Sequence, residues 1–287
     1  MSNVLELRDV CKTYTDFALN SVTFTLPTGH IMGFVGQNGA GKTTTIRLIL
    51  NMAKRESGEI KVFGLDNITD EPAIKQEIGA VFDDLCLVDM WRVHEVEKAL
   101  KGFYSHWDSA QFAAYLKQFK LPPHKKVKEL SRGMKMKLML AVAMSHGAKL
   151  LILDEPTSGL DPVARDELLG ILRGYISDGA KSVFFSTHIT SDLEKIADYI
   201  TLIADGKVFF TGTTENLVEH FLIIKGGLTD LTDEIKARII GLSQTSTSFE
   251  GLLPAAQAGL LSSQLETKPP TIEEILIYIS KGGNEDE

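Results

Sequence analysis

A glycine-rich octapeptide, set between an apolar run and a helical pattern, constrains the fold of this chain more than any other feature. Its residues are Gly36, Gln37, Asn38, Gly39, Ala40, Gly41, Lys42 and Thr43, which fit the pattern G-x-x-x-x-G-K-[ST] of nucleotide phosphate loops. The apolar run His30–Val35 before the loop is typical of a buried strand, and Lys42–Met52 after it has helical spacing. We therefore expect a strand–loop–helix unit that binds phosphate.

Each residue type in this loop suits a bound triphosphate. Glycines let the backbone curl, so that successive N–H groups and the positive end of the following helix face one anion. The Lys42 ammonium can reach the outer phosphates, and the Thr43 hydroxyl can bind Mg²⁺. We expect the phosphates to bind along Gly36–Thr44, one residue beyond the octapeptide. A glycine-rich turn with an incidental lysine is the alternative, but it leaves the flanking strand and helix unexplained.

Two carboxylates follow a second apolar run, Leu150–Leu153, at the point where Pro156 ends the predicted strand. Carboxylates at the end of a buried strand are costly unless they have partners, and a nucleotide site supplies them. Asp154 can then hold Mg²⁺, and Glu155 can polarise an attacking water. The alternative is an ordinary strand that ends in a solvated acidic turn.

The rest of the chain has a pattern of strands that alternate with helices, which predicts an α/β domain. Helical patterns dominate from about residue 89 to 148 and predict a helical insertion. The dipeptide Asp205-Gly206 predicts a tight hairpin between two strands, Tyr199–Ile203 and Lys207–Thr211. We expect one domain over residues 1–212 and a small C-terminal extension over 213–287.

Within the extension, Thr267–Pro270 is typical of a linker, and Gly282–Glu287 is typical of a disordered tail. Thr271 and Glu274 have the spacing of a capping box ahead of the apolar run Ile275–Ile279, which predicts a helix start.

Further motifs narrow the class of nucleotide-binding protein. Leu130-Ser131-Arg132-Gly133-Met134 precedes a helical run, Ser158-Gly159-Leu160-Asp161 follows Glu155, and Ser186-Thr187-His188 ends an apolar strand. Together with the phosphate loop and the acidic pair, they resemble the motifs of the ATPase subunits of ATP-binding-cassette (ABC) transporters, in the same order. They correspond to the signature L-S-G-G-Q, the D-loop and the switch histidine. The resemblance covers about Val4–Gly212.

The resemblance implies a role for each motif at ATP·Mg²⁺. It implies a P-loop NTPase core with a mixed sheet, an N-terminal antiparallel β subdomain and the helical insertion. Two chains would close on two nucleotides, so that Ser131 and Gly133 of one chain meet the nucleotide bound to its mate, and Asp161 would also bind nucleotide. Glu155 and His188 would be catalytic, and Tyr14 would stack on adenine. Each residue also has a simpler interpretation: Ser131 and Asp161 as helix N-caps, His188 as a strand-end histidine and Tyr14 as a surface aromatic.

Two departures from the family pattern stand out. Arg132 and Met134 replace the usual glycine and glutamine of the signature. Asp83 stands where the family has a glutamine that touches Mg²⁺, and its carboxylate could still approach the ion. A solvated acidic turn is the alternative interpretation of Asp83.

The resemblance also implies partners: a second ATPase subunit and a separately encoded membrane-spanning permease. The apolar loop Leu85–Trp91 corresponds to the groove that accepts a short helix of the permease. A single nucleotide-binding domain with a short C-terminal extension is most similar to the branch of the family that exports drugs, peptides or lipids. Two other functions stay open, namely an ABC ATPase that works on DNA or ribosomes, and a weakly catalytic partner in a heterodimer.

Composition limits the partners and the compartment. The net charge of −8 disfavours nucleic acid, which attracts basic surfaces. The chain has only two cysteines, Cys11 and Cys86, too few for a disulfide framework, and this favours the reducing cytoplasm. The longest apolar stretch near the middle, Leu138–Met144, is too short to cross a bilayer. We expect a cytoplasmic protein, peripheral on the inner face of the membrane.

Overall fold

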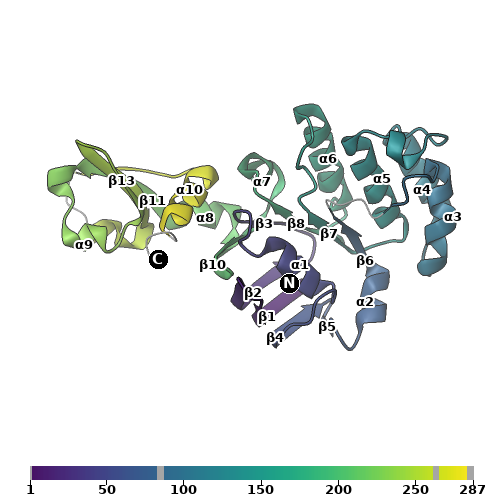
Figure 1. The fold of residues 1–287 in the computed structure, drawn as a ribbon, viewed down its shortest axis with the longest axis horizontal. Helices are drawn as coiled ribbons and strands as arrows, with labels where there is room; N and C mark the ends of the chain where they lie inside the picture. The colour runs from purple at the N-terminus through teal and green to yellow at the C-terminus, as the bar shows by residue number, and fades with distance from the viewer. Residues whose placement is uncertain (1, 83–86, 261–264, 283–287) are drawn as a thin grey trace.

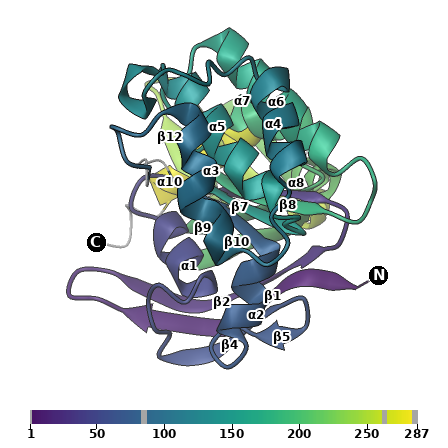
Figure 2. The ribbon, with the colours of Figure 1, turned by 90° about the vertical axis from the view of Figure 1, so that its right-hand side faces the viewer.

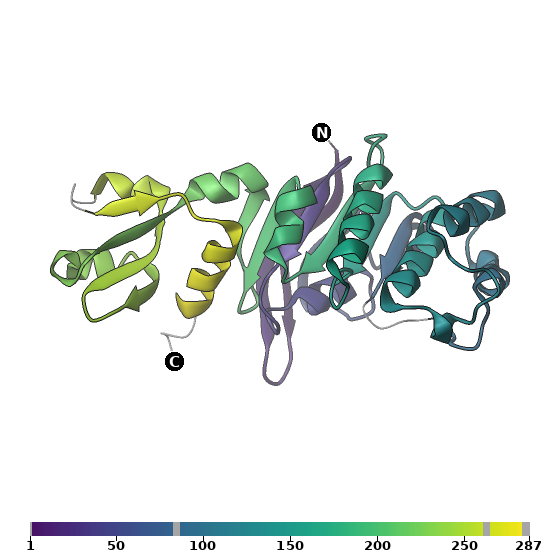
Figure 3. The ribbon, with the colours of Figure 1, turned by 90° about the horizontal axis from the view of Figure 1, so that it is seen from above.

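The computed structural model describes residues 2–82, 87–260 and 265–282 (Figure 1). Three β-sheets make up an elongated molecule, with the C-terminal sheet at one end and the helices that follow β6 at the other (Figure 3). Asp83 and the part of the predicted permease loop from Leu85 to Cys86 lie outside the described residues, as does residue range 283–287 of the predicted tail.

A six-stranded mixed sheet forms the centre of the molecule, in the order β10-β9-β3-β8-β7-β6. Its strands are β3 (Ile31–Val35), β6 (Ile78–Val81), β7 (Leu150–Asp154), β8 (Ser182–Thr187), β9 (Tyr199–Ala204) and β10 (Lys207–Thr213). Five strands are parallel, and only β10 is antiparallel to its neighbour. The carboxyl ends of β3, β7 and β8 therefore meet at one edge, where ligands bind in sheets of this kind.

Helices cover this sheet because its central strands are apolar on both faces. The helices between β3 and β9 are α1 (Lys42–Ile49), α2 (Glu71–Glu77), α3 (Val96–Leu100), α4 (Ser109–Gln118), α5 (Arg132–Ser145), α6 (Pro162–Tyr175) and α7 (Thr190–Ile196). Between β6 and β7 the structure has helices α3 to α5, with short 3₁₀ turns and no strand among the described residues. This is the region where the sequence predicts a helical insertion.

An antiparallel sheet from the N-terminal part of the chain packs below the core (Figure 2). Its strands are β1 (Asn3–Thr13), β2 (Ala18–Pro27), β4 (Ser57–Val62) and β5 (Leu65–Asp66). The aromatic rings of Phe24, Phe34 and Phe184 join the two sheets, with the centroids of Phe24 and Phe184 5.7 Å apart. The mixed central sheet and this antiparallel sheet confirm the predicted fold class.

The C-terminal part forms a sheet that the sequence did not predict. Its elements are α8 (Thr214–His220), β11 (Phe221–Gly227), α9 (Asp233–Lys236), β12 (Ile240–Gln244), β13 (Ser248–Pro254), β14 (Glu266–Lys268) and α10 (Ile272–Gly282). The prediction of a linker over Thr267–Pro270 was wrong at its start, because Thr267 and Lys268 pair with β11. Gly282, predicted as the first residue of the tail, ends α10.

The start of α10 follows the predicted capping box. The Glu274 amide donates to Thr271 Oγ1 at 3.1 Å, and the Thr271 amide donates to Glu274 Oε2 at 2.9 Å. Its apolar face, which includes Ile275 and Ile279, turns toward the core and brings the end of the chain back beside β9.

Within the described ranges, no helix combines the length and apolarity that a membrane span requires.

Candidate nucleotide site

The phosphate loop connects the buried strand β3 to α1 at the carboxyl edge of the central sheet. Gly41, directly before α1, has φ +110°, a backbone conformation that L side chains rarely adopt. A Cβ atom there would lie 2.6 Å from Leu19 and 2.8 Å from Phe17. Glycine at this position therefore permits both the turn and its close packing against β2.

The Lys42 side chain folds back over the loop that precedes it. Its ammonium donates to the carbonyl oxygens of Gly36 at 2.7 Å and Gln37 at 3.1 Å. Its Nζ also lies 3.3 Å from Glu155 Oε1, although the lysine side chain is only 6% exposed. The Lys42 ammonium and the carboxylate of Glu155, the residue that follows β7, therefore lie next to each other.

Asp154 joins the phosphate loop to two strands of the sheet. Its Oδ2 accepts a 2.8 Å hydrogen bond from Thr43 Oγ1, and its Oδ1 accepts a 2.5 Å bond from Ser186 Oγ on β8. A hydroxyl and a carboxylate are hard oxygen donors, which suit Mg²⁺, an ion that binds few protein groups and keeps phosphates and waters as further ligands. No cluster of three or more His, Cys, Asp or Glu suited to a metal occurs in the described ranges. Thr43 and Asp154 fit Mg²⁺ and not a closed metal cage.

Glu155 and His188 contact each other at the edge of the site. His188 Nδ1 lies 2.8 Å from Glu155 Oε2, and the histidine is 45% exposed while the glutamate is 16% exposed. Glu155 has φ +49°, which is uncommon for a residue with a side chain. The bond from the Glu155 amide to Ser186 Oγ, at 3.0 Å, holds this backbone. Ser186 therefore holds both acidic residues in place, and its position at the end of an apolar strand does not predict this role.

A cleft runs along the outer side of the phosphate loop. It is lined by Asp16, Phe17, Asn38, Gly39, Gly41, Lys42, Thr43, Thr44 and Glu155. Phe17, which the sequence analysis did not single out, offers the aromatic ring of this lining. Tyr14 is not among the lining residues; its ring is 45% exposed and lies 5.3 Å from Lys12 Nζ. The stacking of Tyr14 on adenine stays a prediction.

Ser131, Gly133 and Asp161 lie at the N-termini of two neighbouring helices. Ser131 caps α5 by accepting from the Met134 amide at 3.3 Å. Asp161 caps α6 by accepting from two amides at 3.0 Å. The side chain of Ala164 on α6 faces Gly133, where a Cβ atom would lie 3.3 Å away. Among the described residues, no hydrogen bond or ion pair joins these three residues to the phosphate loop, so their nucleotide contacts stay predictions.

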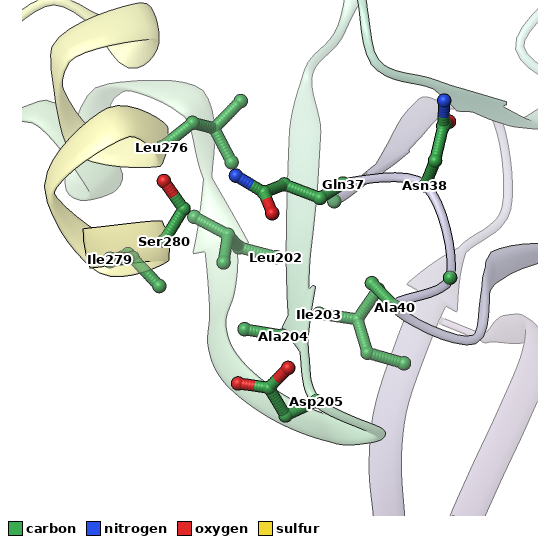
Figure 4. Close-up of a pocket in the computed structure, with 12 residues that line it drawn as sticks. Gln37, Asn38, Ala40, Leu202, Ile203, Ala204, Asp205, Leu276, Ile279 and Ser280 are labelled. Atoms are coloured by element: carbon green, nitrogen blue, oxygen red, sulfur yellow. The ribbon is translucent and has the colours of Figure 1, made fainter. Parts of the chain in front are cut away.

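A second pocket lies behind the phosphate loop, between this loop and α10 (Figure 4). Leu276, Ile279 and Ser280 line it from the helix, and Leu202–Asp205 line it from β9 and the turn that follows. The Gln37 side chain points toward the helix, whereas Asn38 points away from it. The C-terminal part of the chain therefore reaches the back of the nucleotide site.

Comparisons with known proteins agree with this geometry. A family model described as "ABC transporter" matches residues 19–158. The ABC transporter ATP-binding protein YtrB of Bacillus subtilis is 27% identical over 97% of this chain and 96% of its own length. The bacitracin transport ATP-binding protein BcrA of Bacillus licheniformis is 31% identical over 72% of this chain and 69% of its own.

A solved structure described as the ATP-binding subunit of an ABC transporter superposes with a TM-score of 0.68 at 26% identity. The match covers 75% of this chain and 91% of that one, which confirms the P-loop NTPase core. The chain therefore belongs to the ATP-binding proteins of ABC transporters, a family of ATPases.

Proposed function

We propose that this chain hydrolyses ATP at the site formed by Lys42, Glu155 and His188 and thereby drives a separately encoded permease. The observation that supports this most strongly is the contact chain from Lys42 Nζ through the Glu155 carboxylate to His188 Nδ1, with separations of 3.3 and 2.8 Å. It places a phosphate-binding cation, a water-polarising carboxylate and an imidazole next to one another. These are the groups that phosphoryl transfer to water needs.

Each group has a defined task in this proposal. The N–H groups of the phosphate loop and the Lys42 ammonium bind the β- and γ-phosphates, so that the developing charge meets fixed donors. The Glu155 carboxylate accepts a hydrogen bond from the attacking water and orients it in line with the γ-phosphate. His188 holds Glu155 and offers its other nitrogen, Nε2, toward the γ-phosphate. Mg²⁺ held by Thr43 and Asp154 would neutralise phosphate charge when bound.

The proposal includes a dimer of ATPase subunits. The N-termini of α5 and α6, capped by Ser131 and Asp161, carry positive partial charge and lie side by side. Arg132 adds a cation beside them, because its side chain packs against Gly159. This edge would close on the γ-phosphate bound to the second subunit.

The permease would dock near the predicted loop, at the face that the helical region presents. Val88, Met90 and Phe103 are 46%, 54% and 72% exposed, respectively. Leu87 and Trp91 pack partly against the core and support this surface. Exposed apolar side chains of this size commonly mark a protein interface. We propose that the chain sits on the cytoplasmic face of the membrane and drives export of a drug, peptide or lipid; relatives named for bacitracin transport and for Nod factor export support this proposal.

Two variants test the catalytic assignment. Glu155→Gln keeps the size of the side chain but removes the carboxylate, and we expect ATP turnover to fall at least about 100-fold while ATP binding persists. His188→Ala should also lower turnover by about 10-fold or more. Turnover is measured by phosphate release, and binding by a fluorescent ATP analogue. Unchanged turnover in Glu155→Gln would refute the assignment.

A copurification experiment tests the transport assignment. The tagged chain is expressed together with a candidate permease, a multi-span membrane protein of the same organism, and the membrane fraction is extracted in detergent. We expect recovery of both proteins, with loss of the permease when Met90 and Phe103 are both changed to Asp. Recovery with ribosomes or DNA instead would favour the non-transport function.

A further inference from the structure

Asp192 is a buried carboxylate that the catalytic proposal does not use. It lies in the first turn of α7, four residues after His188, and its exposed fraction is 0%. Neither of its carboxylate oxygens has a hydrogen-bond partner in the described part of the chain. The positive end of α7 compensates part of its charge, but a buried carboxylate without hydrogen bonds is costly.

Arg165 faces Asp192 from the neighbouring helix. It lies in the first turn of α6, four residues after Asp161, and its Nε is 3.9 Å from Asp192 Oδ1. This Nε also has no hydrogen-bond partner among the described residues. A separation of 3.9 Å gives Coulomb attraction without a hydrogen bond, and such a pair offsets little of the desolvation of its carboxylate.

The two helices follow two separate segments of the nucleotide site. Helix α6 begins directly after the D-loop segment Ser158–Asp161, and α7 begins two residues after His188. The helices lie side by side over the central sheet (Figures 1 and 2). Thr187 Oγ1 accepts a 3.0 Å hydrogen bond from the Ile189 amide, so the short connection from His188 to α7 is fixed. A displacement of α7 against α6 would therefore move His188 against Glu155.

We propose that the Arg165–Asp192 pair is a positioning device that sets α7 against α6 and thereby holds His188 at hydrogen-bond distance from Glu155. This inference rests on the proposed catalytic roles of Glu155 and His188. The pair touches no nucleotide group itself and acts through His188. The attraction between the two charges favours close approach of α7 to α6, although the pair makes no hydrogen bond.

The first test separates positioning from stability. Asp192→Asn keeps the shape of the side chain but removes the attraction to Arg165. We expect kcat to fall about tenfold and KM for ATP to change less than about twofold, since a shift in a catalytic group affects the transition state. The melting temperature should hold or rise, because a poorly compensated buried charge is removed. An unchanged kcat, or a fall in melting temperature that accounts for the lost activity, would overturn the inference.

The chain offers a matched control between the same two helices. Lys195 on α7 and Asp166 on α6 form an exposed ion pair with a separation of 3.1 Å and exposed fractions of 48% and 62%. Asp166→Asn should leave kcat unchanged, because an exposed pair constrains little. An equal loss of kcat in this control would assign the effect to any charge change between the helices and would overturn the inference.

A second pair of variants keeps the test decisive if Asp192→Asn does not fold. Arg165 is 27% exposed, so its substitution removes little buried surface, although Arg165→Gln leaves the Asp192 charge without its cation and should lower the melting temperature. Arg165→Gln should lose kcat as Asp192→Asn does, and Arg165→Lys, which keeps the charge, should recover most of it. Equal kcat in the two Arg165 variants would overturn the inference.

The closing experiment combines Asp192→Asn with His188→Ala in single-turnover measurements. If Asp192 acts through His188, the double variant is as slow as His188→Ala alone, because there is no imidazole left to position. If the loss of turnover in the double variant equals the product of the losses in the two single variants, the two residues act independently. That result would overturn the inference while leaving the proposed function intact. If His188→Ala itself kept full turnover, the proposed function would fail, and the inference would fail with it.

Discussion

The Ser186 hydroxyl donates a 2.5 Å hydrogen bond to Asp154 Oδ1 and accepts a 3.0 Å bond from the Glu155 amide. One side chain on β8 therefore fixes both acidic residues at the end of β7. The parallel pairing that places Asp154 opposite Ser186 makes this possible. The support of the acidic pair is thus a property of the sheet and not of either segment alone.

We expect Ser186→Ala to lower ATP turnover by about 10-fold or more. The substitution leaves Asp154 Oδ1 and the Glu155 amide without this partner, at a cost of about 1–3 kcal/mol in stability. It also frees the backbone of Glu155, which has φ +49°. Turnover and thermal unfolding are measured together. Thr201→Val, which removes a buried hydroxyl on β9 that bonds to Thr211, is the control and should lose stability without a comparable loss of turnover.

Gly206 connects the β9–β10 hairpin to the phosphate loop. Its amide donates to the Ala40 carbonyl at 3.2 Å, and its carbonyl accepts from the Asn20 amide at 2.8 Å. It has φ +71°, and a Cβ atom would lie 1.8 Å from the Ala18 carbonyl oxygen. We expect Gly206→Ala to destabilise the fold by more than about 3 kcal/mol and to weaken ATP binding.

Gly147→Ala is the control for this prediction. Gly147 has a similar φ of +75°, but a Cβ atom there would meet nothing within 4 Å. The Gly147→Ala variant should therefore lose only about 1–2 kcal/mol of unfolding free energy, the conformational penalty of a positive φ, and its ATP affinity should not change. Chemical denaturation and nucleotide titration distinguish the two variants. Equal losses would show that the contact at Ala18 does not matter.

The sequence predicts the central sheet well because its strands carry uninterrupted apolar residues, as in Leu150–Leu153. It also places the phosphate loop, since the loop, its strand and its helix are contiguous. The C-terminal sheet escapes prediction: Glu266–Lys268 is exposed at each residue, so no burial pattern marks it, and only backbone pairing with β11 makes it a strand.

The supporting residues of the site could not be predicted for a related reason. Ser186 belongs to the motif Ser186-Thr187-His188, but that motif does not indicate its bonds to Asp154 and Glu155. Phe17 is an aromatic residue in a short loop and has no local signature. Both acquire a role through neighbours more than 20 residues away in sequence, namely Asp154 for Ser186 and Gly41 for Phe17. A sequence motif identifies the residues that bind a ligand. The residues that hold those binding residues in place depend on which strands become neighbours in the fold.

The pocket that α10 and the phosphate loop line together predicts coupling between the C-terminal part of the chain and nucleotide binding. Leu276 lines the pocket that Gln37 faces (Figure 4). Leu276→Ala should enlarge this pocket, loosen the loop and weaken ATP binding by about threefold or more. Ile277→Ala on the same helix is the control, because Ile277 is 45% exposed and does not line the pocket. Equal ATP affinities in the two variants would contradict the coupling.

The environment of His146 predicts a pH dependence of stability. His146 is 2% exposed, its ring stacks on Tyr104 with a centroid distance of 3.9 Å, and its Nδ1 lies 3.2 Å from the Gln76 carbonyl oxygen. Burial lowers the pKa of His146 below its ordinary value, because the charged ring loses its hydration. The folded protein then binds this proton more weakly than the unfolded chain does.

The sign of the pH effect follows from this difference. The contribution of neutral His146 to stability is complete above the ordinary pKa of about 6.5 and is lost as the pH falls through that value toward the lower folded pKa. We expect the melting temperature to fall between pH 7.5 and pH 5.5, and to fall less in His146→Phe, whose ring cannot be protonated. His106→Gln, at an exposed histidine, should keep the wild-type slope. The loss of the bond to Gln76 lowers the melting temperature of His146→Phe by the same amount at each pH. It therefore does not affect the slope of melting temperature against pH, which is the quantity compared. Parallel slopes in wild type and His146→Phe would show that another group governs the acid sensitivity of this fold.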